Sequence, residues 1–208
     1  MNQNLNKFTE FEAKFYPVNK DEYRERLRKI GAVLVTPERK MRRAIVDSDA
    51  YPQLTCHYIR VRDEGDSVRL SAKTHARIGG SIDDQKEIDV KVSDYDKTIK
   101  IIESMGFRFS IYQETKRETW SYKKAEITID TWPGLETYSE IEANSEAEVK
   151  KIALILDLDW EKRIITGIKE VYMAVYGMKI EDVTEKICYI TFENNPFDVI
   201  PKAETTIK

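Results

Sequence analysis

Residues 9–16 read TEFEAKFY, and this stretch decides the fold class. Charged residues occupy every second position, at Glu10, Glu12 and Lys14, and apolar residues fill the positions between them. Side chains at i, i+2 and i+4 of a β-strand share one face, so the pattern predicts a strand with one charged and one apolar face. A charged face of this kind meets either bulk water or an enclosed cavity. The other predicted strands decide between the two.

The same alternation recurs in four later segments, HYIRVRD (57–63), SVRLSAK (67–73), KEIDVKV (86–92) and TYSEIEA (137–143). Two further extended segments, FSIYQETKRETWSY and AEITIDTW, add Arg117 and Asp130. By parity, the charged faces together carry seven acids (Glu10, Glu12, Glu87, Asp89, Asp130, Glu140 and Glu142) and seven bases (Lys14, Arg60, Arg62, Arg69, Lys73, Lys91 and Arg117).

Helical patterns separate the predicted strands. Amphipathic spacing, capping residues and terminal glycines predict helices within 19–31, 93–106, 145–158 and 167–177, with Ser93 expected to cap the second. Neighbouring strands joined by short turns indicate an antiparallel meander. The two halves of the chain repeat a layout of helices and strands without a fixed sequence period, which suggests a barrel. The expected class is α+β.

The pairing of like charges favours a cavity over a solvated surface. An antiparallel sheet with one wet face also alternates, and ion pairs stabilise it modestly. Here, however, two ExE pairs and one RxR pair occur, and arginine has the bidentate geometry that phosphate oxygens require. Clustered carboxylates need cations to stay ionised, and their hard oxygens suit Mg²⁺ or Mn²⁺. The bases would then hold a polyanion such as a triphosphate.

Composition excludes several other classes. The 208-residue chain is 41% hydrophobic and 34% charged, with a net charge of −3, so nothing favours general binding to nucleic acid or an anionic membrane. Cys56 and Cys188 form no CxxC pair, which argues against a zinc site or disulfide framework. We see no signal peptide and no apolar run long enough to span a bilayer, and we expect a cytoplasmic protein.

These motifs resemble the CYTH superfamily, the triphosphate tunnel metalloenzymes, which include class IV adenylate cyclases, thiamine triphosphatases and inorganic triphosphatases. The family's ExExK motif matches Glu10, Glu12 and Lys14, and the RxR pair, a downstream lysine and a late D…ExE follow in order. The likeness spans roughly residues 8 to 176. It implies an eight-stranded antiparallel closed β-barrel, the triphosphate tunnel, with flanking helices.

The resemblance also implies roles for individual residues. The metal ligands would be Glu10, Glu12, Asp130, Glu140 and Glu142, holding Mg²⁺ or Mn²⁺, and the substrate-binding residues Lys14, Arg60, Arg62, Lys73 and Arg117. The catalytic set would be Glu10, Glu12, Lys14 and Glu87, with Glu87 ordering neighbouring bases or a water. One departure is Thr115, which stands where the family often has a lysine, while Lys116 points to the other face by parity.

The function implied is a divalent-metal-dependent triphosphatase acting on tripolyphosphate, thiamine triphosphate or ATP. Two alternatives stay open: a class IV adenylate cyclase that forms cyclic AMP and pyrophosphate, and a non-catalytic polyphosphate- or nucleotide-binding module, which the Thr115 departure favours.

His57 and His75 lack a neighbouring nucleophile pattern and are expected to be incidental. We expect residues 1–180 to form the tunnel domain and 181–208 a C-terminal extension, and a homodimer is an open alternative.

Overall fold

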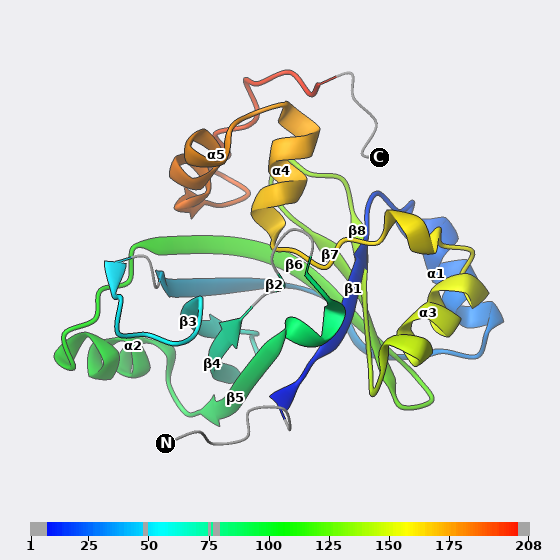
Figure 1. The fold of residues 1–208 in the computed structure, drawn as a ribbon, viewed down its shortest axis with the longest axis horizontal. Coiled ribbons are helices and arrows are strands. Elements are labelled where there is room, and N and C mark those ends of the chain that lie inside the picture. The colour runs from blue at the N-terminus through cyan, green and yellow to red at the C-terminus, as the bar shows by residue number, and fades with distance from the viewer. Residues whose placement is uncertain (1–7, 48–49, 75, 77–79, 204–208) are drawn as a thin grey trace.

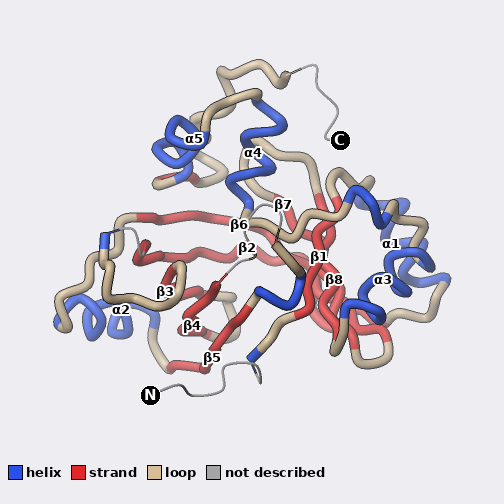
Figure 2. The backbone as a smooth tube through the Cα atoms, viewed as in Figure 1, coloured by secondary structure: helices blue, strands red, loops and turns tan. Residues whose placement is uncertain are grey.

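The computed structural model describes residues 8–47, 50–74, 76 and 80–203. Its centre is a strongly curled antiparallel sheet that forms a half-barrel (Figures 1 and 2). The strands are β1 (Phe11–Phe15), β2 (Val33–Asp47), β3 (Tyr58–Asp63), β4 (Val68–Thr74), β5 (Lys86–Val92), β6 (Ile111–Tyr122), β7 (Ala125–Thr131) and β8 (Tyr138–Ala143). Their order in the sheet is β1-β8-β7-β6-β2-β3-β4-β5, and a short ninth strand, β9 (Tyr189–Ile190), pairs in parallel with β6. The predicted α+β, eight-stranded antiparallel architecture is confirmed.

Five helices flank the sheet: α1 (Lys20–Lys29), α2 (Tyr95–Ser104), α3 (Glu146–Ile155), α4 (Ile168–Tyr176) and α5 (Ile180–Ile187). Two 3₁₀ turns, η3 (Ile82–Asp84) and η4 (Trp160–Lys162), lie wholly within the described residues. The four helices predicted from the sequence are present. Ser93 is not the cap of α2, because the Asp94 carboxylate accepts the Lys97 N–H at 2.8 Å and the helix begins after it. The helix α5 and the strand β9 were not predicted.

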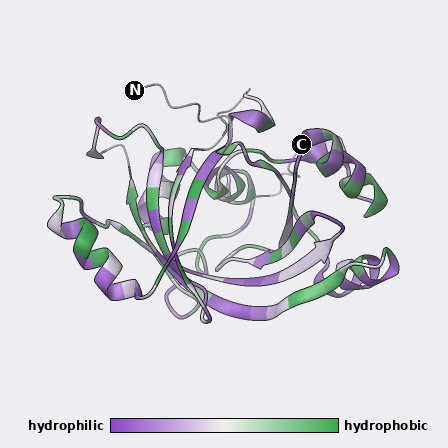
Figure 3. Cartoon of the chain, turned by 90° about the horizontal axis from the view of Figure 1, so that it is seen from below, coloured by the Kyte–Doolittle hydropathy of each residue, from purple (hydrophilic) through white to green (hydrophobic). Residues whose placement is uncertain are grey.

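The sheet carries its apolar residues on the outside and its charges on the inside. Hydrophilic and hydrophobic residues alternate along the strands (Figure 3). Outward-facing Ala13, Ile127 and Ile141 are fully buried in a core shared with α1 and α3, which lie together beside β1 and β8 (Figure 1). A second core joins α2 to the outer face of β3 around Val61 and Ile102. The helices therefore supply the hydrophobic burial, and the interior of the curl is left for polar chemistry.

Closure of the half-barrel is partial within the described residues. The outer strands β1 and β5 meet at one isolated bridge between Thr9 and Lys86, supported by a 3.0 Å hydrogen bond from the Glu10 N–H to the Gln85 carbonyl. The buried Gln85 side chain also donates to the Glu12 carbonyl at 2.8 Å. The expected closed barrel is thus a curled sheet whose edges touch at one point, without a continuous ladder between them.

One end of the curl lies under the C-terminal elements. Trp132, directly after β7, and Tyr138 of β8 pack with Tyr172 of α4 and Val183 of α5 in a third core. Phe197, beyond β9, belongs to the same core. The proposed division at residue 180 stays a prediction. No helix among the described residues is long and apolar enough to cross a membrane.

Candidate active site

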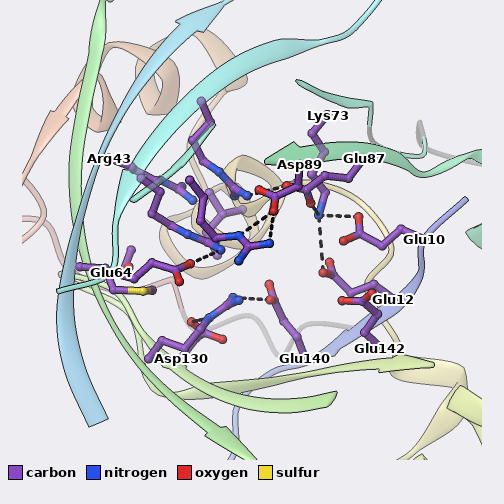
Figure 4. A pocket seen from close by; sticks show the side chains of 18 of the residues that line it. Glu10, Glu12, Arg43, Glu64, Lys73, Glu87, Asp89, Asp130, Glu140 and Glu142 are labelled. Atoms are coloured by element: carbon purple, nitrogen blue, oxygen red, sulfur yellow. Dashed lines mark hydrogen bonds and ion pairs between the residues drawn. The ribbon is translucent and has the colours of Figure 1, made fainter. Parts of the chain in front are cut away.

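A cavity of about 1110 Å³ lies inside the curl, and the inward faces of the eight long strands line it. Every candidate site residue named from the sequence is part of its wall: Glu10, Glu12, Lys14, Arg60, Arg62, Lys73, Glu87, Arg117, Asp130, Glu140 and Glu142. Figure 4 shows ten labelled side chains converging on it from different strands. Alternation along each strand sets this convergence, because one face of a curled sheet points inward throughout. The charged faces therefore meet in one cavity inside the half-barrel.

Three carboxylates form a compact group, which we call the acidic trio: Glu10, Glu12 and Glu142. One oxygen from each lies within 4.8 Å of the other two. Glu12 on β1 stands directly opposite Glu142 on β8 in the strand register. Like charges placed in this way destabilise a sheet, so an ordinary surface avoids the arrangement. The trio therefore requires compensation by cations.

The trio titrates unevenly. Burial, reinforced by the charges of Glu12 and Glu87, raises the pKa of Glu10 to about 8 against the opposing Lys73. Burial and the charge of Glu12 raise the pKa of Glu142 to about 7, although that residue remains exposed to solvent. Burial opposes ionisation of Glu12 as well, but the ammonium groups of Lys14 and Lys73 outweigh it and lower the pKa of Glu12. A divalent cation would favour ionisation of all three.

Lys73 of β4 forms ion pairs both with the acidic trio and with Glu87 of β5. Its ammonium nitrogen lies 2.7 Å from Glu10, 3.6 Å from Glu12 and 3.2 Å from Glu87. Glu87 stands opposite Lys73 in the register and also binds Arg60 at 2.8 Å. Glu87 thus forms ion pairs with two bases, and the ordering role expected of it stays a prediction.

The other two predicted metal ligands lie against Arg117. Asp130 accepts a hydrogen bond from the Arg117 Nε at 2.7 Å, and Glu140 pairs with the Arg117 Nη2 at 2.5 Å. Glu140 also lies 3.7 Å from the Lys14 ammonium. Burial raises the pKa of Asp130 to about 6, against the charge of Arg117. The structure thus brings three of the five predicted metal ligands together in the acidic trio. Asp130 and Glu140 instead form ion pairs with basic side chains. The metal-binding role of all five stays a prediction.

Buried donors point to an anion. Arg60 and Arg62 each keep a buried Nε without a hydrogen-bond acceptor among the described residues. Burial and the charges of Arg60 and Arg117 lower the pKa of Arg62 to about 10, although Glu64 lies only 2.5 Å away. A buried donor without an acceptor costs free energy. An anionic ligand with several oxygens would satisfy these groups.

The donor chemistry of the trio fits a hard divalent cation. Carboxylate oxygens on three side chains match the ligands that Mg²⁺ and Mn²⁺ take, and a buried polar wall suits a cation that keeps part of its water. The pKa values of Glu10 and Glu142 are both raised by partial loss of solvent and by the negative charge of Glu12.

Residues 9–171 match the family model of the CYTH domain. The chain belongs to the CYTH family. Solved structures share the fold of this CYTH domain. A putative adenylate cyclase from Vibrio parahaemolyticus aligns with a TM-score of 0.66 at 16% identity, over 80% of this chain and 98% of that one. A conserved hypothetical protein from Pyrococcus furiosus aligns with a TM-score of 0.63 at 16% identity, over 76% and 97%.

A third structure similar to this CYTH domain is a Hippeastrum protein described as a putative adenylyl cyclase with a dominant triphosphatase activity. Its TM-score is 0.50 at 13% identity, over 79% of this chain and 94% of that one. At such identities the structural likeness shows the fold alone. A search of curated protein sequences finds no match.

Sequence reasoning missed several residues that line the CYTH cavity, among them Arg39, Arg43 and Glu64. Arg43 follows Arg42, and two consecutive arginines do not reveal which one faces inward. Of the two histidines, His57 lines the cavity and His75 lies outside the described residues. Thr115 lines the cavity as well, whereas Lys116 lies over the Phe192 ring.

Proposed function

We propose that this CYTH protein is a divalent-metal-dependent phosphohydrolase that cleaves the terminal phosphate from a triphosphate held in the cavity. One observation carries the proposal: the acidic trio and a set of arginines and lysines line the same cavity (Figure 4). A triphosphate is the kind of ligand that needs both, since its charge is neutralised partly by bases and partly by metal. The description of the Hippeastrum protein as a triphosphatase gives further support.

Each part of the site has its own task in this mechanism. Arg60, Arg62 and Arg117 would hold phosphate oxygens through charge-assisted hydrogen bonds and keep the chain in line. Lys14 and Lys73 would add positive charge beside the trio, where they already lie. A cation bound by Glu10, Glu12 and Glu142 would supply Lewis acidity at the reacting phosphoryl group. Glu87 would keep Arg60 and Lys73 oriented.

Adenylate cyclisation is the second candidate. The cavity wall includes Ile45, Ile111 and Trp132, apolar side chains that a bare phosphate chain does not require. An organic group such as a nucleoside could rest there. In that case the ribose hydroxyl would attack the α-phosphorus and pyrophosphate would leave. The Vibrio structure is described as a putative adenylate cyclase.

The test is a product assay across substrates and metals. Purified protein is incubated with tripolyphosphate, thiamine triphosphate or ATP, each with Mg²⁺, Mn²⁺ or Ca²⁺, and phosphate, pyrophosphate and cyclic AMP are followed. Release of phosphate supports the proposal. Cyclic AMP with pyrophosphate would replace it with cyclisation, and binding without product would indicate a non-catalytic module. As an active-site control, Glu12→Gln should abolish turnover while the far-ultraviolet circular dichroism stays unchanged.

A further inference from the structure

Arg43 adds one more strand to those that contribute arginines and lysines to the cavity wall. It lies on β2, opposite Arg62 of β3 on one side and opposite Gln113 of β6 on the other. Its side chain lines the cavity. Figure 4 shows it across the cavity from Glu10, Glu12 and Glu142. Arg43 is therefore the part of the positive wall that faces the acidic trio from the far side.

The charge of Arg43 is not matched by an acid. Arg60 lies 2.8 Å from Glu87 and Arg117 lies 2.7 Å from Asp130, but within the described part of the chain no carboxylate comes within ion-pair distance of Arg43. Burial and the charge of Arg60 lower the pKa of Arg43 to about 10. A part-buried cation beside other cations destabilises the ligand-free protein. The cost is offset when an anion binds.

Arg43 is held in one orientation by neutral groups. Its guanidinium lies 4.2 Å from the centre of the Trp132 ring, and its Nε donates to the Gln113 Oε1 at 2.8 Å. Gln113 is itself fixed, because its Nε2 donates to the Ile187 carbonyl at 2.7 Å. None of the hydrogen bonds among the described residues uses the two terminal nitrogens of Arg43. A guanidinium group that is held in one orientation, with both terminal nitrogens available as donors, is suited to bind two oxygens of one phosphate group.

We propose that Arg43 binds the phosphate group of the substrate that lies farthest from the acidic trio, and so makes the site selective for a chain of three phosphates over two. This inference rests on the proposed function for the identity of the ligand. A chain of two phosphates held at the trio by Lys73 would leave Arg43, on the opposite side of the cavity, without a phosphate partner (Figure 4). Thr115 of β6 stands opposite Met41 of β2, two residues from Arg43. Arg43 would therefore supply a positive charge close to the position where the family often has a lysine and this chain has Thr115.

The test compares three variants in the absence of turnover. Arg43→Met removes the charge and keeps bulk against Trp132; Arg43→Lys keeps the charge but not the fork; Arg42→Gln alters the neighbouring residue, which points away from the cavity toward Asp63 and Tyr95. Dissociation constants for tripolyphosphate and pyrophosphate are measured by calorimetry, with Ca²⁺ and without metal, and melting temperature is recorded without ligand.

We expect Arg43→Met to weaken tripolyphosphate binding about 10- to 100-fold, as for loss of a charged hydrogen bond, and to leave pyrophosphate binding unchanged. Arg43→Lys should give an intermediate loss, and Arg42→Gln none. The ligand-free melting temperature of Arg43→Met should be equal to or above that of the wild type, because an unpaired charge is removed.

Two results would overturn the inference: unchanged tripolyphosphate binding in Arg43→Met, or equal losses for both ligands. A lower melting temperature with unchanged binding would show that Arg43 serves only the packing of Trp132. Failure of the proposed function looks different, because the wild type would then bind tripolyphosphate and release no product. The comparison of variants stays valid in that case, since it measures binding alone.

Discussion

At the scale of single residues, the cavity stores electrostatic strain that a ligand can relieve. Glu12 faces Glu142 across two paired strands, and Arg43 faces Arg62 across two others. Cross-strand pairs of like charge are unfavourable in ordinary sheets, where opposite charges face each other. Like-charge pairs of both signs in one cavity indicate a ligand that brings both positive and negative charge, such as a metal and a phosphate chain.

The first prediction concerns pH and the metal-free protein. Glu10, Glu142 and Asp130 have pKa values of about 8, 7 and 6, all above their unfolded values, so the folded state holds more protons than the unfolded state between pH 5 and 8. The free energy of unfolding should therefore fall as pH rises across this window. Glu12 and Glu87, whose pKa values are lowered, contribute in the opposite sense only below about pH 5.

Urea denaturation at pH 5, 6, 7 and 8 in the presence of chelator measures this dependence. Glu10→Gln should flatten the curve, because one of the three raised carboxyls is gone. A wild-type stability that rises over the window, or an unchanged slope in Glu10→Gln, would contradict the account.

A second prediction concerns Arg60. Arg60→Ala should weaken tripolyphosphate binding by about 1.5 to 3 kcal/mol, the range for hydrogen bonds to charged groups. Calorimetric titration measures the change, with Arg42→Ala as a control on the outer face of the sheet. An unchanged dissociation constant would remove Arg60 from the phosphate-binding set.

The alternation of side chains between the two faces of a strand made most of the candidate site predictable from the sequence. The prediction failed where charged and apolar residues do not alternate. Short strands with strict alternation assign Glu10, Arg60 and Glu142 to the inner face without a structure. In β2 the adjacent Arg42 and Arg43 are followed by three apolar residues, 44–46, so the sequence shows no alternation there and Arg43 was missed, although the register with β6 is regular from Arg39 to Ile45. Which acids meet also depends on register, which the sequence does not specify.

At the scale of elements, the seam between β1 and β5 sets the shape of the cavity. These outer strands share one bridge, and Gln85 strengthens it: its backbone carbonyl accepts from Glu10, and its side chain donates to the Glu12 carbonyl. Gln85 is fully buried. Glu10 and Glu12 both belong to the acidic trio. The hydrogen bonds of the seam therefore also position these two candidate metal ligands beside the Lys73 ammonium group.

A third prediction follows for Gln85. Gln85→Ala removes the side-chain hydrogen bond and should lower the free energy of unfolding by about 1 to 3 kcal/mol. It should also speed amide hydrogen exchange in β1 and β5 more than in β6 and β7. Denaturant titration and exchange mass spectrometry measure both effects, with Gln53→Ala on an exposed loop as control. Uniform exchange across the sheet would show that Gln85 does not hold the seam.

Elements with local signals were predictable, and elements that depend on distant partners were not. Asn19 caps α1 and Ser145 caps α3 through bonds to nearby backbone N–H groups, as their sequence spacing indicates. The two-residue strand β9 exists only because it pairs with Tyr112 and Gln113 of β6, far away in the chain. The helix α5 does carry a local signal that the prediction overlooked, since Val183 and Ile187 share its buried face and Glu181 and Asp182 lie in its first turn.

At the scale of the whole molecule, the fold reverses the usual arrangement of a small sheet protein. Apolar side chains face outward and are covered by α1, α3 and α2, while the interior carries the charges. The hydrophobic contribution to stability is therefore made outside the curl, and the cavity can carry unfavourable charge without unfolding the chain. Whether two copies associate stays a prediction.

The most direct measurement is a crystal structure with Mn²⁺ and tripolyphosphate, with anomalous diffraction collected to locate manganese. The account predicts an anomalous peak bonded to oxygens of Glu10, Glu12 and Glu142, and phosphate groups that reach from this peak to Arg60 and Arg117. Manganese and phosphate on the outer surface, or phosphate in the cavity with no manganese at the three glutamates, would contradict it.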